Sequence, residues 1–170
     1  MANMLDDPFA AIAEDVDIQK FIKITKKKES KVRTKLRRSL FEQKGIKARK
    51  YTLNSDSAWK RFSDSCFAPR RTDHNRGRTY TLNEWIEKQG WIVENEKGKH
   101  FTSLKDKEIL FITAWDIEKD VRIIIDGFHR ACAIKYLNHS PETLEEPFEV
   151  LECYGNNMEE VSREHRLFDR

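Results

Sequence analysis

The stretch from Val121 to Leu137 constrains the fold most, because two different hydrophobic patterns meet there across a short polar turn. Residues Val121–Ile125 are rich in β-branched side chains, which predicts a buried strand. Residues Phe128–Leu137 do not alternate; their apolar positions return at helical spacing, at Ala131, Ile134 and Leu137. The chain is therefore expected to form a strand, a tight turn and a helix in immediate succession.

The turn itself, Asp126-Gly127-Phe128-His129-Arg130, has the composition of a phosphate site. A helix start offers backbone N–H groups without intrahelical partners and carries the positive end of the helix dipole, so it attracts anions. Gly127 allows a tight turn and a close approach of a ligand to the backbone. Arg130 adds a guanidinium fork that matches phosphate oxygens, and His129 adds a second donor. Asp126 could hold a magnesium ion or accept a proton.

Two simpler interpretations of this turn compete with a ligand site. Asp-Gly is a favoured hairpin turn that needs no ligand, although the residues after Gly127 have a helical pattern. His129 and Arg130 could also be ordinary surface residues of a first helical turn. Basic residues there oppose the helix dipole unless an anion lies nearby, so their presence favours a bound anion.

The flanking segments supply the rest of the expected fold. Glu108–Trp115 and Phe148–Tyr154 have strand composition, and Thr81–Gln89 has the pattern of a helix opened by a capping box of Thr81 and Glu84. Trp59 and Phe62 are expected on the buried face of a further short helix. These patterns predict an α+β fold in which a small mixed sheet carries the Phe128–Leu137 helix, within a domain that spans residues 51–170.

The preceding residues 1–50 are expected to form an extension that is first acidic and then basic. A short helix at Phe9–Ala13 or disorder fits the acidic part, and Ile18–Ile24 fits either a strand or a helix. Ser30–Gln43 has the pattern of a basic amphipathic helix. From Lys26 to Lys50 there are twelve Lys or Arg and two Glu, a local balance of +10.

This basic stretch, together with an arginine-containing loop, is a candidate binding surface for DNA phosphates. The expected contacts are the basic side chains of Lys26, Lys27, Lys28, Arg33, Arg37, Arg38, Arg70 and Arg71. Alternatively, the stretch is a solvated helix, or it docks on the acidic region 140–161, which has seven Glu and no Lys or Arg. That acidic region is most simply interpreted as a solvated face.

Cysteine spacing and hydropathy narrow the protein class. The three cysteines have no CxxC spacing and predict neither a disulfide framework nor a zinc site, and Cys132 is expected in the core. The histidines show no ligand spacing, so no protein-bound metal centre is expected. No apolar run approaches the roughly 20 residues that span a bilayer. A cytoplasmic protein without a membrane partner is therefore expected.

The segment Ile123-Ile124-Ile125-Asp126-Gly127-Phe128-His129-Arg130-Ala131-Cys132-Ala133 resembles the strand-turn-helix signature of the ParB/sulfiredoxin superfamily. The resemblance covers 108–154, and it implies a ParB/sulfiredoxin-like fold in which Gly127, Phe128, His129 and Arg130 bind nucleotide phosphates. It also implies ATP or CTP with Mg²⁺ as the ligand. Phe128 stands where sulfiredoxins carry their reactive cysteine, which argues against their reaction. The DNA-reading domain of partition proteins has no counterpart in the 16 residues after Tyr154.

Two functions follow as hypotheses. The first is an ATP-dependent hydrolase or phosphoryl-transfer enzyme, with Asp126, His129 and Arg130 as catalytic residues. Its basic arm would place it on plasmid or phage DNA, where nuclease activity is one expectation. The second is a non-catalytic module that uses the same phosphate pocket and basic arm to bind DNA or a partner protein, for example as an inhibitor.

Overall fold

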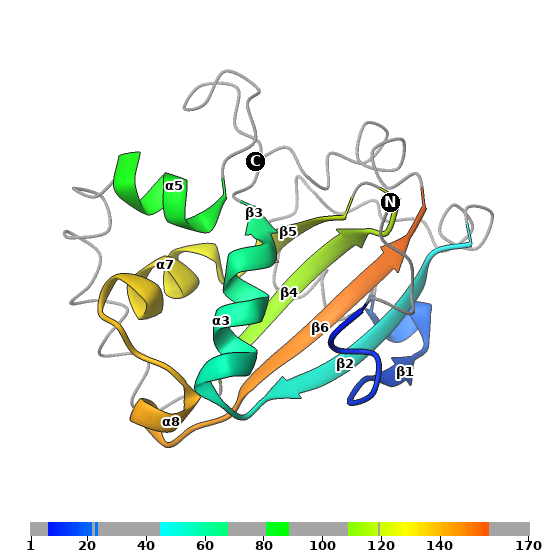
Figure 1. The fold of residues 1–170 in the computed structure, drawn as a ribbon. Coiled ribbons are helices and arrows are strands. Elements are labelled where there is room, and N and C mark those ends of the chain that lie inside the picture. The colour runs from blue at the N-terminus through cyan, green and yellow to red at the C-terminus, as the bar shows by residue number, and fades with distance from the viewer. Residues whose placement is uncertain are drawn as a thin grey trace.

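A computed structural model describes residues 7–21, 23, 45–67, 81–88, 109–118 and 120–156, and within them it shows an α+β fold built on a six-stranded mixed sheet (Figure 1). The strands are β1 (Glu14–Val16), β2 (Lys47–Leu53), β3 (Cys66–Phe67), β4 (Ile109–Asp116), β5 (Val121–Asp126) and β6 (Phe148–Gly155). The helices with assigned bounds are α3 (Asp56–Ser65), α5 (Leu82–Lys88), α7 (Phe128–Tyr136) and α8 (Pro141–Leu144).

The sheet has the order β1-β2-β6-β4-β5-β3. Its centre is the parallel pair of β4 and β6, and β2 joins β6 in antiparallel register over the whole of Lys47–Leu53. Strand β5 lies antiparallel to β4, with a shift of register between Ile112 and Thr113, and the short β3 pairs parallel with β5. The strand that ends at the candidate turn is therefore next to the centre of the sheet.

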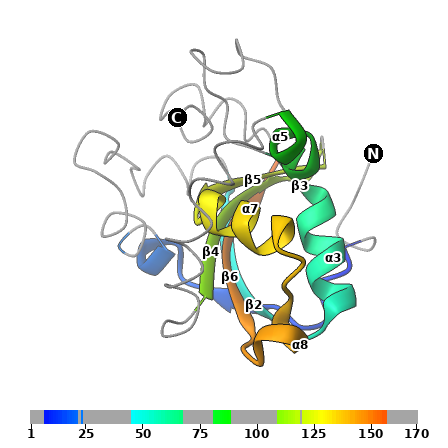
Figure 2. The same cartoon turned by 90° about the vertical axis from the view of Figure 1, so that its left-hand side faces the viewer.

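Both faces of the sheet are covered. Helices α3, α7 and α8 lie on one side, and the helical residues 18–21 lie on the other (Figure 2). On the helix side, alternate strand residues pack with the aromatic rings of α3, where Trp59 stacks on Phe111 with ring centroids 5.7 Å apart. On the other side Phe21 is fully buried against a smaller cluster that includes Leu151. Helix α5 packs against both α3 and α7.

The elements expected around the candidate turn are confirmed to within one or two residues. The strands β4, β5 and β6 and the helix α7 lie where their patterns predict, and Trp59 and Phe62 are core residues. The capping box of α5 is also present: the Thr81 N–H donates to Glu84 Oε1 at 3.3 Å, and the Glu84 N–H donates to Thr81 Oγ1 at 3.1 Å.

The N-terminal part differs from the expectation. A helix is expected at Phe9–Ala13, but residues 8–12 form successive turns, and the Phe9 ring is buried in the core. Strands β1 and β2 begin before residue 51 and belong to the sheet. Strand β2 escaped prediction because three of its seven residues are basic, which obscures the alternation of inward and outward positions. The expected basic helix at Ser30–Gln43 lies outside the described residues.

Candidate functional site

The candidate turn has the backbone geometry of a strand that passes directly into a helix. Gly127 is the N-cap of α7 and adopts a left-handed conformation, with φ 91° and ψ 13°. The first helical hydrogen bond runs from the Ala131 N–H to the Gly127 carbonyl at 2.9 Å. The N–H groups of His129 and Arg130 precede that bond, so they have no partner within the helix. No acidic side chain occupies the first turn of α7.

Gly127 also sits against β4. A Cβ atom at this position would lie 2.9 Å from Phe111 Cδ1 and 3.2 Å from the Leu110 carbonyl oxygen. Both the positive φ and the lack of space therefore require glycine. Phe128 is buried, so its side chain anchors the start of α7 in the core and only its backbone could face a ligand.

Asp126 ends β5 just before Gly127, Arg130 lies in the first turn of α7, and both residues are partly exposed. The backbone of His129 belongs to α7, whereas its side chain lies outside the described part of the structure. The basic residues predicted to contact DNA also lie outside the described residues: Lys26, Lys27, Lys28, Arg33, Arg37, Arg38, Arg70 and Arg71. The described part of the candidate site is therefore a glycine turn with one carboxylate and one guanidinium.

A second polar cluster, which sequence reasoning missed, lies on the helix side of the sheet across β2, β6, β4 and β5. Its centre is Glu152, which is fully buried on β6. Oε2 of Glu152 accepts from Arg49 Nε at 3.0 Å and from Arg49 Nη2 at 2.7 Å. Oε1 accepts from Arg122 Nε at 2.5 Å and from Thr113 Oγ1 at 2.9 Å, with Tyr51 Oη further away at 3.3 Å. Side chains from three other strands, β2, β4 and β5, thus meet on one carboxylate of β6.

Aromatic rings enclose the two arginines of this cluster. The Cζ atom of Arg49 lies 5.0 Å from the centre of the Trp115 ring and 5.1 Å from that of Tyr154. The Cζ atom of Arg122 lies 5.1 Å from Trp115 and 5.2 Å from Phe9. Such contacts stabilise a cation that has lost its water.

Electrostatics keep the cluster ionised. Burial by itself raises the pKa of Glu152, but the charges and hydrogen bonds of Arg122 and Arg49 more than offset it, so the pKa lies below its usual value. Burial and the charge of Glu152 raise the pKa of Tyr51, whose hydroxyl therefore stays protonated and donates. Burial lowers the pKa of Arg122, but Glu152 outweighs that effect and the net change is upward.

This cluster corrects the interpretation of two charged segments. The composition of region 140–161 predicts that Glu152 lies on a solvated acidic face, yet its side chain is fully buried. Arg49 belongs to the basic stretch, yet among the basic residues of β2 it is buried and only Lys47 and Lys50 are exposed. The sequence does contain charged residues of opposite sign at inward positions of β2 and β6. These positions can be recognised as inward only once the pairing of Arg49 with Glu152 is known.

The cysteines offer no nucleophile. Cys66, Cys132 and Cys153 are unpaired and buried, which confirms that Cys132 is a core residue. Burial raises the pKa of Cys66 to about 12, and it raises the pKa of Cys132 further. A thiol that stays protonated does not attack.

Comparisons of the chain with models of known protein families, with curated proteins and with solved structures find no match. A functional assignment therefore rests on the fold, on the turn at residues 126–130 and on the cluster around Glu152. Among the described helices, none is both long enough and apolar enough to cross a membrane.

Proposed function

We propose that the turn at residues 126–130 binds the phosphates of a nucleotide such as ATP or CTP with Mg²⁺, and that the protein hydrolyses the nucleotide or transfers its phosphoryl group. The observation that carries this proposal is the left-handed Gly127, packed against Phe111 and Leu110 at the start of α7. A glycine in this position lets phosphate oxygens approach the backbone amides of the first helical turn.

Each described residue of the turn has a role that suits phosphate chemistry. The amides of His129 and Arg130 would donate to phosphate oxygens, and the Arg130 guanidinium would balance charge that develops on the transferred group. Asp126 is a partly exposed carboxylate that ends β5. Magnesium in nucleotide sites is held by one or two carboxylates with substrate phosphates, so Asp126 fits that role. The ion would supply further charge neutralisation when bound.

The ParB/sulfiredoxin-type assignment rests on the same turn and on its sheet. Strand β5 ends at Asp126, α7 follows at once, and the later β6 returns beside β4. The buried cysteines and Phe128 agree with a member that lacks sulfinic-acid chemistry. The proposal includes nuclease action on plasmid or phage DNA. It does so because the basic residues that precede β2 are candidate contacts for DNA phosphates.

Nucleotide binding tests the site directly. Titration of the full chain with ATP and with CTP, each with Mg²⁺, should show saturable binding by calorimetry, and a phosphate-release assay should show turnover. Arg130→Ala should weaken binding by roughly tenfold to a hundredfold, the usual worth of a hydrogen bond to a charged group. Arg61→Ala, which removes an exposed arginine from α3, is the matched control and should bind like the wild type.

The outcomes separate the two hypotheses. Failure of every nucleotide to bind the wild-type chain would refute the phosphate site. Binding without turnover would contradict the enzyme and support the non-catalytic module. Equal losses of nucleotide affinity in Arg130→Ala and Arg61→Ala would mean that the nucleotide does not bind at the turn.

DNA binding needs a separate test. Replacement of Lys26, Lys27 and Lys28 by Gln should reduce the slope of log affinity against log salt concentration by about 0.9 for each lost phosphate contact. Substitution is preferable to deletion of the basic stretch, because Arg49 and the rest of β2 belong to the core. An unchanged slope would contradict the DNA assignment.

A further inference from the structure

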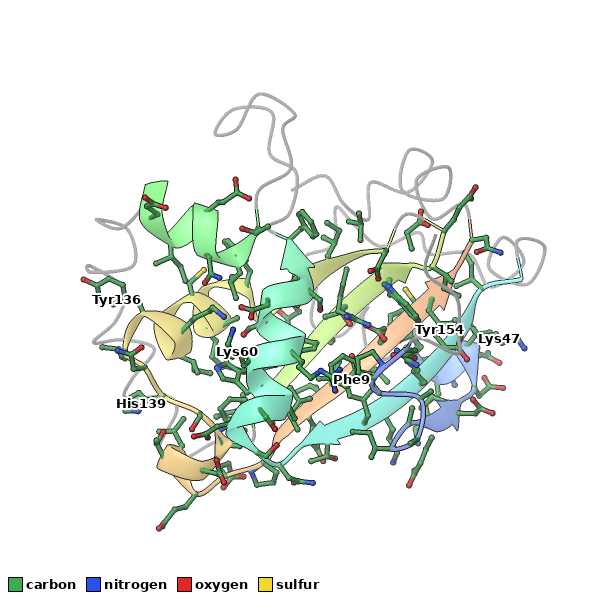
Figure 3. All side chains as sticks on the ribbon, in the orientation of Figure 1. Phe9, Lys47, Lys60, Tyr136, His139 and Tyr154 are labelled. Atoms are coloured by element: carbon green, nitrogen blue, oxygen red, sulfur yellow. The ribbon has the colours of Figure 1, made fainter. Side chains whose placement is uncertain are left out.

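The Glu152 cluster is covered by a short N-terminal segment instead of a helix. In Figure 1 the dark blue segment lies in front of β2 and β6, to the right of α3. Figure 3 labels Phe9 at the same place. Residues 8–12 of this segment form turns. Pro8 and Ala10 are exposed, whereas Asp7 and Phe9 are buried. Residues 7–10 therefore meet the protein through two buried side chains that alternate with exposed residues, and Ala13 packs on the core further along.

Asp7 completes the charge balance of the cluster. Arg49 donates from Nη1 to Asp7 Oδ2, while its other donors face Glu152. Arg49, Arg122, Glu152 and Asp7 together carry two positive and two negative charges. Without Asp7 the buried cluster would hold one excess positive charge. A buried charge without a partner is costly, so the cluster requires a carboxylate at this position.

Phe9 fills an aromatic position beside that carboxylate. Its ring is stacked on Tyr51, with centroids 4.8 Å apart and planes 7° apart, and it meets the Phe62 ring edge-on at 6.2 Å. The Cζ atom of Arg122 lies 5.2 Å from the centre of the Phe9 ring. Buried aromatic side chains and desolvated arginines are typical of the residues that dominate the binding energy of protein interfaces.

Asp7 and Phe9 supply the buried side chains of the segment, and its C-terminal end is held by Ala13 on the core and by the pairing of β1 with β2. The Phe9 N–H donates to Asp7 Oδ1 at 3.0 Å, and the Ile12 N–H donates to the Phe9 carbonyl at 3.2 Å, so both bonds lie inside the segment. Residues 7–13 belong to no strand or helix, and the Ile12 side chain is 51% exposed. An equivalent segment from another protein could make the same contacts.

We propose that Arg49, Arg122, Tyr51 and Phe62 form a recognition site for an acidic peptide segment of a partner protein, with an Asp followed two residues later by Phe. Residues 7–9 of this chain occupy the site as an internal competitor. The site is separate from the proposed phosphate turn: Arg122 and Asp126 lie four residues apart on β5, about 13 Å along the strand. The two arginines recognise the Asp carboxylate of the peptide. The rings of Tyr51 and Phe62 recognise its Phe side chain.

The test uses the full-length chain and a synthetic peptide. The probe is the N-acetylated peptide of residues 7–13, Asp-Pro-Phe-Ala-Ala-Ile-Ala, with a fluorophore at its C-terminus; acetylation removes a positive charge that would repel Arg49. The protein is the double variant Asp7→Ala/Phe9→Ala, which vacates the site. Fluorescence anisotropy should show saturable binding to this variant.

Two controls make the result specific. A peptide with Asn for Asp and Ala for Phe should bind roughly tenfold to a hundredfold more weakly, because it lacks the charged hydrogen bond and the ring. The wild-type chain should bind the original peptide more weakly than the variant does, because its tethered segment competes at an effective concentration in the millimolar range.

Three results would overturn the proposal: a folded double variant that does not bind the peptide, a control peptide that binds equally well, or a wild-type chain that binds as tightly as the variant. Circular dichroism establishes that the variant is folded. If it is not, the milder Asp7→Asn/Phe9→Leu variant replaces it under the same criteria. Nucleotide binding measured on the same variant should be unchanged, which keeps this result separate from the phosphate proposal.

Discussion

Replacement of Glu152 by glutamine should destabilise the protein far more than the same replacement at an exposed glutamate of the same strand. Glutamine has nearly the same shape and keeps one oxygen that can accept from Thr113 or Arg122. It removes the negative charge, so the buried arginines keep only Asp7 as a counter-ion. The perturbation is therefore electrostatic, with little change in packing.

The burial and pairing of Glu152 determine the expected loss of unfolding free energy. Removal of one partner from a buried ion pair costs about 3–5 kcal/mol, because the remaining charge stays buried. Glu152 is 0% exposed and bridges two arginines, so solvent does not screen the loss. Since glutamine retains an acceptor, the lower end of the range, about 3 kcal/mol, is expected. Domains are commonly stable by only about 5–15 kcal/mol, so the effect is large.

Urea denaturation followed by circular dichroism at pH 7 measures this loss. Glu149→Gln is the matched control, because Glu149 lies on the same strand but is exposed. The control should change the free energy of unfolding by less than about 0.5 kcal/mol, the usual range for surface positions. The urea dependence of the free energy should stay the same for both variants if each unfolds in the same two-state transition.

The pH dependence gives an independent check. The pKa of Glu152 is lowered from its ordinary value of 4.5, so its contribution is fully present above about pH 4.5 and is lost as the pH falls through the folded-state pKa. The difference between wild type and Glu152→Gln should therefore narrow below pH 4.5. A loss of less than about 1 kcal/mol at pH 7, as for a surface ion pair, would refute this reasoning. A difference that widens on acidification would also refute it.

Three further predictions concern the turn, a cap and the thiols. Gly127→Ala should lower the free energy of unfolding by about 1–3 kcal/mol. Gly45→Ala should lower it less, because Gly45 also has a positive φ but has open space around it. Equal losses in urea denaturation would contradict the steric argument. Ser55→Ala should cost about 1 kcal/mol of unfolding free energy, since Ser55 Oγ accepts from the Ala58 N–H at the start of α3, and a change below about 0.3 kcal/mol would contradict that role. An aromatic disulfide reagent should label the thiols only after unfolding, and rapid labelling of the native chain would contradict the burial of Cys66, Cys132 and Cys153.

Local patterns were sufficient for the elements around the candidate turn. The β-branched run before Asp126 and the helical spacing after Gly127 each depend on neighbours within a few residues. The capping box of α5 and the burial of Trp59 and Phe62 depend on helical geometry in the same way. The sequence alone therefore placed the turn between a strand and a helix. It could not show that Gly127 lies against Phe111, because that contact depends on how β4 and β5 pair.

The tertiary structure alone decided which charges are buried. Arg49 and Glu152 are 103 residues apart and lie in stretches whose composition suggests solvated basic and acidic surfaces. They meet because β2 pairs with β6 in a register that places both side chains on the helix side of the sheet. Asp7 and Phe9 then cover them from a segment without regular structure. A charged residue is exposed by default, and only a specific partner from a distant segment makes its burial favourable, which is why no local pattern could reveal this cluster.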